Sequence, residues 1–165
     1  MSFERAIAFV LEHEGGLVDN PKDPGGVTKF GISKRAYPHL DIRNLSVMEA
    51  MDIYQQDYWR PIKGDKLPMG VDIVMLDYAV HSGVRHAVQA LQRAVGAKAD
   101  GVIGPGTLSL VAARKRPRTL ALDLARARMN LLVRLVKQKP SQVEFLGGWM
   151  SRLFDLVGEI YAVTM

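Results

Sequence analysis

A glutamate at the end of an amphipathic segment is the residue of this sequence best placed to act as an acid. Apolar residues precede it at the spacing of one helix face: Phe3, Ile7, Val10 and Leu11. Glu14 continues that face by one step. Partial burial and the negative end of the helix dipole would both disfavour its ionised form. The pattern therefore predicts a general acid, a group that donates a proton to a breaking bond.

The loop after Glu14 is rich in glycine, proline and hydrogen-bonding side chains. Gly15 and Gly16 are expected to cap the helix and to let a ligand approach the backbone closely. Asn20 and Asp23 follow, and the prolines and glycines around them predict successive turns. Loops of this kind beside a rigid helix commonly carry binding and catalytic groups. The alternative is a solvated glutamate at a fraying helix end with an ordinary glycine cap.

Two stretches of the chain resemble a known family of wall-degrading enzymes. Residues 14–33, E-G-G-L-V-D-N-P-K-D-P-G-G-V-T-K-F-G-I-S, resemble the N-terminal signature of glycoside hydrolase family 108. Its members are lysozyme-like N-acetylmuramidases of phage endolysins and of bacterial proteins once labelled secretion activators. Residues 96–110, G-A-K-A-D-G-V-I-G-P-G-T-L-S-L, resemble the predicted peptidoglycan-binding region that accompanies the family. The resemblance implies a lysozyme-like fold and cleavage of peptidoglycan without a cofactor.

The resemblance also implies roles for three residues. Glu14, the first residue of E-G-G, would be the catalytic acid. Phage-type lysozymes have a glutamate, eight residues, an aspartate, five residues and a threonine. Here eight residues separate Glu14 from Asp23, but only four separate Asp23 from Thr28. Asp23 is expected to stabilise charge or position water and Thr28 to help place that water, with turn and backbone capping as the alternatives.

Six residues are candidates for contacting the glycan: Gly15, Gly16, Asn20, Tyr78, Asp100 and Thr107. Tyr78 shares a helical stretch with Asp77 and His81, as a sugar-binding aromatic residue would. Packing in the core is the simpler explanation for that tyrosine. Asp100 and Thr107 belong to D-G-V-I-G-P-G-T, which is expected either to lie near the polymer or to form a plain turn between helices.

Composition indicates a globular, cysteine-free chain with an excess of positive charge. The 165 residues are 48% hydrophobic, include no cysteine and carry a formal charge of +5. The lack of cysteine excludes disulfides, thiol catalysis and Cys-ligated zinc. The four histidines follow no metal-binding spacing, so no metal site is expected. The charge suits an anionic partner, and we expect peptidoglycan rather than nucleic acid.

The sequence also suggests where the chain works. No run is apolar enough to cross a bilayer, and residues 1–13 lack the charge order of a secretory signal. We expect a monomer that is synthesised in the cytoplasm. It would reach the wall after release, as through a phage holin, or by a non-standard export route.

Helical spacing dominates the chain, and the predicted fold class is all-α or nearly so. Ser46 and Glu49 form a capping box before a helix that reaches about residue 59. Further helices are predicted over residues 71–80, 84–95, 107–113, 118–137 and 149–161, with a break at Gly147–Gly148. A short hairpin is expected between residues 17 and 32. The domains would be a catalytic lobe, residues 1–70, and a helical peptidoglycan-binding lobe, residues 71–165, in one compact unit.

Three functions are compatible with these features. The leading hypothesis is a muramidase that cleaves the β-1,4 bond between N-acetylmuramic acid and N-acetylglucosamine. A lytic transglycosylase would use the same polymer and a lone glutamate but would form a 1,6-anhydro product without water. A non-catalytic helical module that binds wall polymer or nucleic acid would explain the charge, but it would leave the position of Glu14 unexplained.

Overall fold

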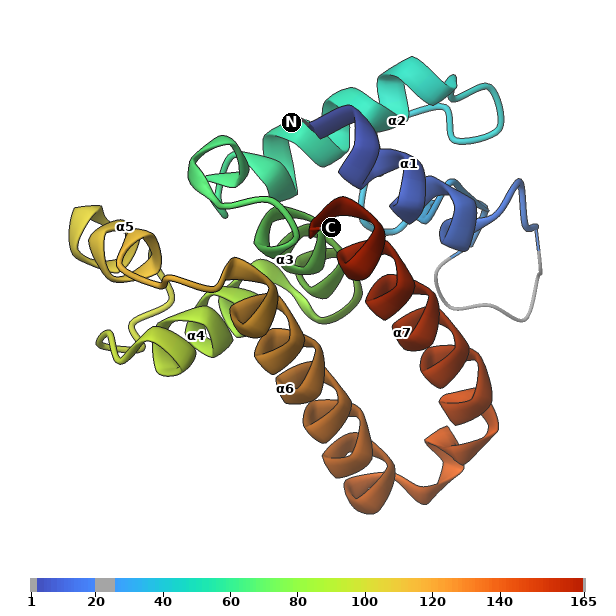
Figure 1. Ribbon diagram of the computed structural model, residues 1–165. Coiled ribbons are helices and arrows are strands. Elements are labelled where there is room, and N and C mark those ends of the chain that lie inside the picture. The colour runs from blue at the N-terminus through green and yellow to red at the C-terminus, as the bar shows by residue number, and fades with distance from the viewer. Residues whose placement is uncertain (1–2, 20–25, 165) are drawn as a thin grey trace.

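The molecule is built almost entirely from helices. The computed structural model describes residues 3–19 and 26–164, arranged as Figure 1 shows. The helices are α1 Phe3–Glu14, α2 Val47–Tyr54, α3 Val71–Ser82, α4 Val84–Val95, α5 Pro105–Ala112, α6 Pro117–Gln138 and α7 Val143–Thr164. Short 3-10 turns lie at Gly64–Lys66 and Pro140–Gln142. No helix in the described ranges is long and apolar enough to cross a membrane. The prediction of a nearly all-α, lysozyme-like fold is confirmed.

α3 is the central helix. Every residue from Val71 to Ala79 is buried, because α1, α4, α6 and α7 all pack against this helix (Figure 1). A helix that is largely apolar on all its faces is expected inside a domain rather than at its surface. One hydrophobic cluster extends from Phe3 in α1 to Ile160 in α7. The two lobes distinguished in the sequence therefore share a core.

α6 and α7 form a long hairpin that projects from the rest of the molecule (Figure 1). α6 covers the helix predicted over residues 118–137 and extends it by one residue at each end. α7 is also 22 residues long, and it begins at Val143 rather than at Trp149. The predicted break at Gly147–Gly148 is wrong, since both glycines lie inside α7. Packing of α7 along α6 outweighs the low helix propensity of glycine.

The expected hairpin is present and short. β1 Thr28–Lys29 pairs antiparallel with β2 Ile32–Ser33. The two connecting residues, Phe30 and Gly31, have positive φ values of 52° and 75°, as a tight type I′ turn requires. Val18 exchanges two backbone hydrogen bonds with the first residue of β1. These bonds attach the hairpin to the segment that leaves α1.

α2 begins as the sequence predicts. The Glu49 N–H donates to the Ser46 hydroxyl at 3.2 Å, and the Ser46 N–H donates to the Glu49 carboxylate at 2.8 Å. The capping box is thus confirmed. After Tyr54, a π-helical turn runs over Gln55–Trp59, a rare pattern that often lies near functional sites. The predicted helix reaches residue 59, but its last five residues are wound more loosely.

A buried glutamine organises the glycine-rich turn between α4 and α5. Gln92 is 1% exposed, and its amide nitrogen donates to Asp100 Oδ1 at 2.8 Å. Its amide oxygen accepts a hydrogen bond from the Gly101 N–H at 2.9 Å. α5 begins at Pro105, so the predicted helix start at Thr107 is wrong. Proline suits the first helical position because no intrahelical donor is needed there.

Replacing Gln92 with methionine should lower the free energy of unfolding by about 1–3 kcal/mol, the cost of leaving partly buried polar groups unpaired. Urea denaturation measures the change. Gln89→Met is the matched control, because Gln89 lies on the same helix and its amide makes one long bond, 3.4 Å, to the Ala99 carbonyl. Equal losses in the two variants would contradict the organising role of Gln92.

Candidate active site

Glu14 lies in a cleft of ligand size. It is the last residue of α1, and Gly15 follows with a φ of 73°, the left-handed conformation that commonly ends helices. The Glu14 side chain is 20% exposed. The cleft has a volume of about 460 Å³, within the range of small-molecule sites. It is lined by His13, Glu14, Val80, His81, Gly148, Trp149 and Arg152. The carboxylate singled out in the sequence therefore faces a space that a sugar could enter.

Arg152 connects Glu14 to two fully buried charges. Its Nη1 donates to Glu14 Oε1 at 2.6 Å, and its Nε donates to Asp77 Oδ1 at 2.7 Å. The other carboxylate oxygen of Asp77 forms an ion pair with Arg128. The side chains of Asp77 and Arg128 are 0% exposed. From the cleft to the centre of the molecule the four charges alternate in sign, so each buried charge has an opposite neighbour.

Arg152 adds an electrostatic effect that the sequence did not reveal. A charge-assisted hydrogen bond from a guanidinium stabilises negative charge on the oxygen that accepts it, and here that oxygen is Glu14 Oε1. Burial lowers the pKa of the neighbouring His81, and the positive charge of Arg152 lowers it further. The His81 imidazole is therefore neutral at neutral pH and can both donate and accept a hydrogen bond.

The turn of the hairpin packs directly on Glu14. A Cβ atom added to Gly31 would lie 2.6 Å from Glu14 Oε2 and 2.5 Å from the Tyr54 hydroxyl oxygen. Only glycine leaves room there and adopts the positive φ without strain. The Tyr54 hydroxyl donates to the Phe30 carbonyl at 2.8 Å. Burial, followed by the negative charge of Glu14, raises the pKa of Tyr54, so this hydroxyl remains a donor and holds the turn in place.

The loop candidates have different surroundings. Asn20 and Asp23 lie outside the described residues. Thr28 is the first residue of β1, and its hydroxyl donates to the Gly26 carbonyl at 3.3 Å. This contact is the backbone capping that was the alternative to a catalytic role. Gly16 is exposed, and within the described part of the chain no heavy atom lies within 4 Å of an added Cβ.

Three residues proposed to contact the glycan do not line the Glu14 cleft. Tyr78 is 3% exposed and belongs to the hydrophobic core, and it also lines a separate hollow of about 630 Å³ formed with residues of α4 and α6. Thr107 is 7% exposed, and its hydroxyl oxygen is a further acceptor, at 3.4 Å, for the Gln92 amide. A hydrogen bond from the Gln92 amide lowers the pKa of Asp100, and a hydrogen bond from the Val102 N–H lowers it further. The polar groups of Asp100 and Thr107 thus serve the turn between α4 and α5.

Sequence reasoning missed the partners of Glu14. Arg152 lies 138 positions away along the chain, and no local spacing links the two. Asp77 did carry a signal, because an acid inside the apolar run V-D-I-V-M-L-D-Y-A-V must be paired if it is buried. Gly31 carried another, since a glycine at the centre of an expected hairpin marks a turn with positive φ.

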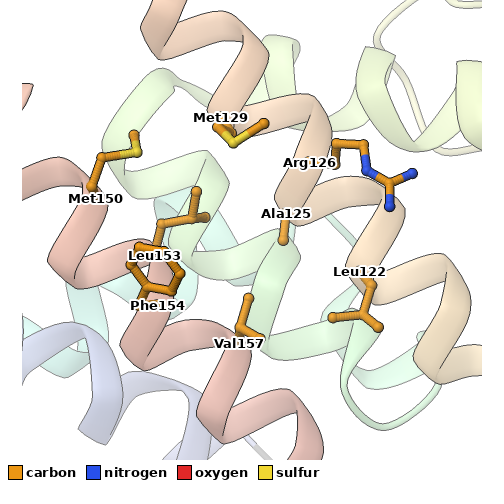
Figure 2. Close-up of a pocket in the computed structure, with 8 residues that line it drawn as sticks. All are labelled: Leu122, Ala125, Arg126, Met129, Met150, Leu153, Phe154 and Val157. Atoms are coloured by element: carbon orange, nitrogen blue, oxygen red, sulfur yellow. The ribbon is translucent and has the colours of Figure 1, made fainter.

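A second hollow of the described structure lacks the groups that acid–base chemistry needs. A hollow of about 260 Å³ lies between α6 and α7, and Figure 2 shows its mainly apolar walls. It is lined by Leu122, Ala125, Arg126, Met129, Met150, Leu153, Phe154 and Val157. No carboxylate or histidine is among these residues. Within the described ranges, no three acidic or histidine side chains are grouped to hold a metal ion.

Replacing Gly31 with alanine should displace the Glu14 carboxylate and lower the rate of peptidoglycan hydrolysis, the activity expected from the sequence, by about 100-fold. Gly26→Ala is the matched control. Gly26 also has a positive φ, 69°, but an added Cβ would meet its nearest atom at 3.8 Å. Both variants should lose about 1–2 kcal/mol of stability through backbone strain. Equal rates for the two variants, measured as release of reducing sugar, would contradict the packing of this turn on Glu14.

Comparisons with known proteins agree with this geometry. Residues 7–83 match the family model Glycosyl hydrolase 108, and residues 86–154 match the model Predicted Peptidoglycan domain. The structure is similar to that titled Structure of Brucella abortus SagA, with a TM-score of 0.84 and 37% sequence identity. This similarity covers 98% of the present chain and 95% of the other. No curated protein sequence matches the chain.

The cleft is assembled from both matched regions. Glu14, Asp77 and His81 lie within the first, and Trp149 and Arg152 lie within the second. The ion pair between Glu14 and Arg152 therefore joins the glycosyl hydrolase region to the peptidoglycan region. Two family models match the chain, and a solved relative resembles it over nearly its full length. The chain therefore belongs to the glycosyl hydrolase 108 family and is a glycoside hydrolase that acts on peptidoglycan.

Proposed function

We propose that Glu14 is the general acid that cleaves the β-1,4 bond between N-acetylmuramic acid and N-acetylglucosamine. The observation that carries the proposal is its place in the cleft. Among the described residues that line this cleft, Glu14 is the only carboxylate, and it is half-buried at a fixed position. Cleavage of a glycosidic bond requires a proton on the leaving oxygen, and a carboxyl group commonly supplies it.

The neighbours of Glu14 suit a group that gains and loses a proton. As the proton moves to the glycosidic oxygen, negative charge develops on Glu14. Arg152 Nη1, 2.6 Å from Glu14 Oε1, stabilises that charge. This contact strengthens during proton transfer, so it lowers the barrier more than it favours the bound substrate.

Asp23 and Thr28 complete the proposed reaction. Asp23 would stabilise the oxocarbenium-like sugar or activate the attacking water, and Thr28 would help place that water. The spacing between Glu14 and Asp23 supports this assignment. Further support comes from the hairpin that carries Thr28, because its turn packs on Glu14 at Gly31.

The setting of the reaction is also a proposal. The chain would act as a monomeric, bacteriolytic enzyme of the phage endolysin type, made in the cytoplasm and admitted to the wall by a holin or an equivalent route. Its formal charge of +5 supports attraction to an anionic wall.

Replacing Glu14 with glutamine keeps the shape of the side chain and removes its ionisable proton. The release of reducing ends from purified peptidoglycan should fall by ~100- to 10,000-fold. Glu12→Gln is the matched control, since Glu12 is an exposed residue of the same helix, and this variant should keep the wild-type rate. Activity of Glu14→Gln within a few-fold of wild type would contradict the assignment of Glu14 as the general acid.

Mass spectrometry of the wild-type products tests the reaction type. Hydrolysis adds water and leaves a reducing N-acetylmuramic acid end. A product containing 1,6-anhydro-N-acetylmuramic acid would instead identify a lytic transglycosylase, in which Glu14 acts without a water nucleophile.

A further inference from the structure

A row of aromatic side chains extends from Glu14 along α7, and the proposed reaction does not use it. The rings of His81 and Trp149 meet edge to face with centroids 5.7 Å apart, and those of Trp149 and Phe145 stack at 6.0 Å with planes 29° apart. His81 and Trp149 line the Glu14 cleft. Phe145 lies one helical turn before Trp149 and is 48% exposed. The row therefore leads from the reactive carboxyl group to the protein surface.

Gly148 is a second unusual feature of the same face. It lines the cleft and lies in the interior of α7, where glycine is among the least favourable residues. An added Cβ would meet no heavy atom of the described residues within 4 Å, and the φ of Gly148 is not positive. Neither internal packing nor backbone conformation therefore requires glycine at this position. What the glycine does provide is open space against the helix backbone, directly beside Trp149.

The chemistry of this face matches one side of a sugar ring. A pyranose presents a C–H face beside polar hydroxyl and acetamido groups, and an aromatic face carries the partial negative charge that attracts such C–H groups. The neutral imidazole of His81 can bond a hydroxyl or acetamido group. A ring that lies on Trp149 and Phe145 would also need a close approach to the helix backbone, which the missing side chain of Gly148 allows.

We propose that Phe145, Gly148 and Trp149 form a binding subsite for an N-acetylhexosamine unit of the glycan strand, next to the unit whose bond is cleaved at Glu14. The proposal rests on the proposed function, because the subsite and Glu14 bind one continuous chain. A pair of aromatic residues four positions apart can also serve only to stabilise a helix. The experiment below separates these two roles.

The probe is purified sacculi, and the quantity measured is retention of the Glu14→Gln protein, which does not degrade them. Phe145→Ala and Gly148→Gln are tested in that background. Phe154→Ala and Gly158→Gln are the matched controls. Phe154 is also on α7, is 75% exposed and lines the apolar hollow of Figure 2. Gly158 is likewise a helix glycine with no heavy atom of the described chain near an added Cβ, but it is not a cleft residue.

The subsite predicts a selective loss of binding. Phe145→Ala should weaken retention by about 2- to 12-fold, the range for one aromatic contact. Gly148→Gln should also weaken it, because the new side chain fills the space beside Trp149. Both controls should bind as the parent does. Both glycine replacements should raise the melting temperature, because glutamine is a better helix former. A loss of binding in Gly148→Gln therefore cannot come from unfolding. Equal retention in all four variants, or an equal loss in the controls, would overturn the proposal.

Failure of the subsite and failure of the proposed function would look different. If the wild-type chain produces reducing ends while all four variants are retained equally, the subsite is wrong and the function stands. If retention falls only in Phe145→Ala and Gly148→Gln while the wild-type chain produces no reducing ends, the subsite stands and the proposed hydrolysis is wrong.

Discussion

The rest of the structure depends on the alternating ion pairs that link Glu14, Arg152, Asp77 and Arg128. They join α1, α7, α3 and α6, and the two innermost side chains have no exposure to water. Burying charges in this way is costly unless each retains an opposite partner in good geometry. A shift of α6 would separate the buried Arg128 from Asp77, and a shift of α3 would separate the buried Asp77 from both arginines. The ion pairs therefore set the positions of the helices relative to one another and, through them, the position of Glu14.

The same constraint connects folding to catalysis. Only the Glu14 end of the charge chain opens into a cleft, and there the hairpin turn limits the carboxylate through Gly31 and Tyr54. The Glu14 carboxyl group is thus held by a cation on one oxygen and by close packing on the other. Fixed groups of this kind need little reorganisation when charge moves during a reaction. Trp149 and Phe145 of the aromatic row lie on α7, the helix that carries Arg152, so binding of substrate at the proposed subsite would act on the same helix.

Much of the local structure could be predicted from the sequence because its causes are local. The apolar stripe before Glu14, the capping box at Ser46 and the hairpin before residue 33 all depend on residues within a few positions. The partners of Glu14 could not be predicted, since Arg152 and Asp77 meet it only through tertiary packing. The same cause explains the wrongly predicted break: α7 continues through Gly147–Gly148 because it packs along α6.

The central claim is that Arg152 stabilises the negative charge that develops on Glu14 in the proposed proton transfer. The kcat of Arg152→Gln on purified peptidoglycan tests it most directly, with Arg126→Gln as the control, because Arg126 is 70% exposed on α6. Loss of one fixed donor to a developing charge commonly lowers kcat by ~100- to 1,000-fold. The account predicts a loss of this size in Arg152→Gln alone. Equal kcat values for the two variants would contradict it.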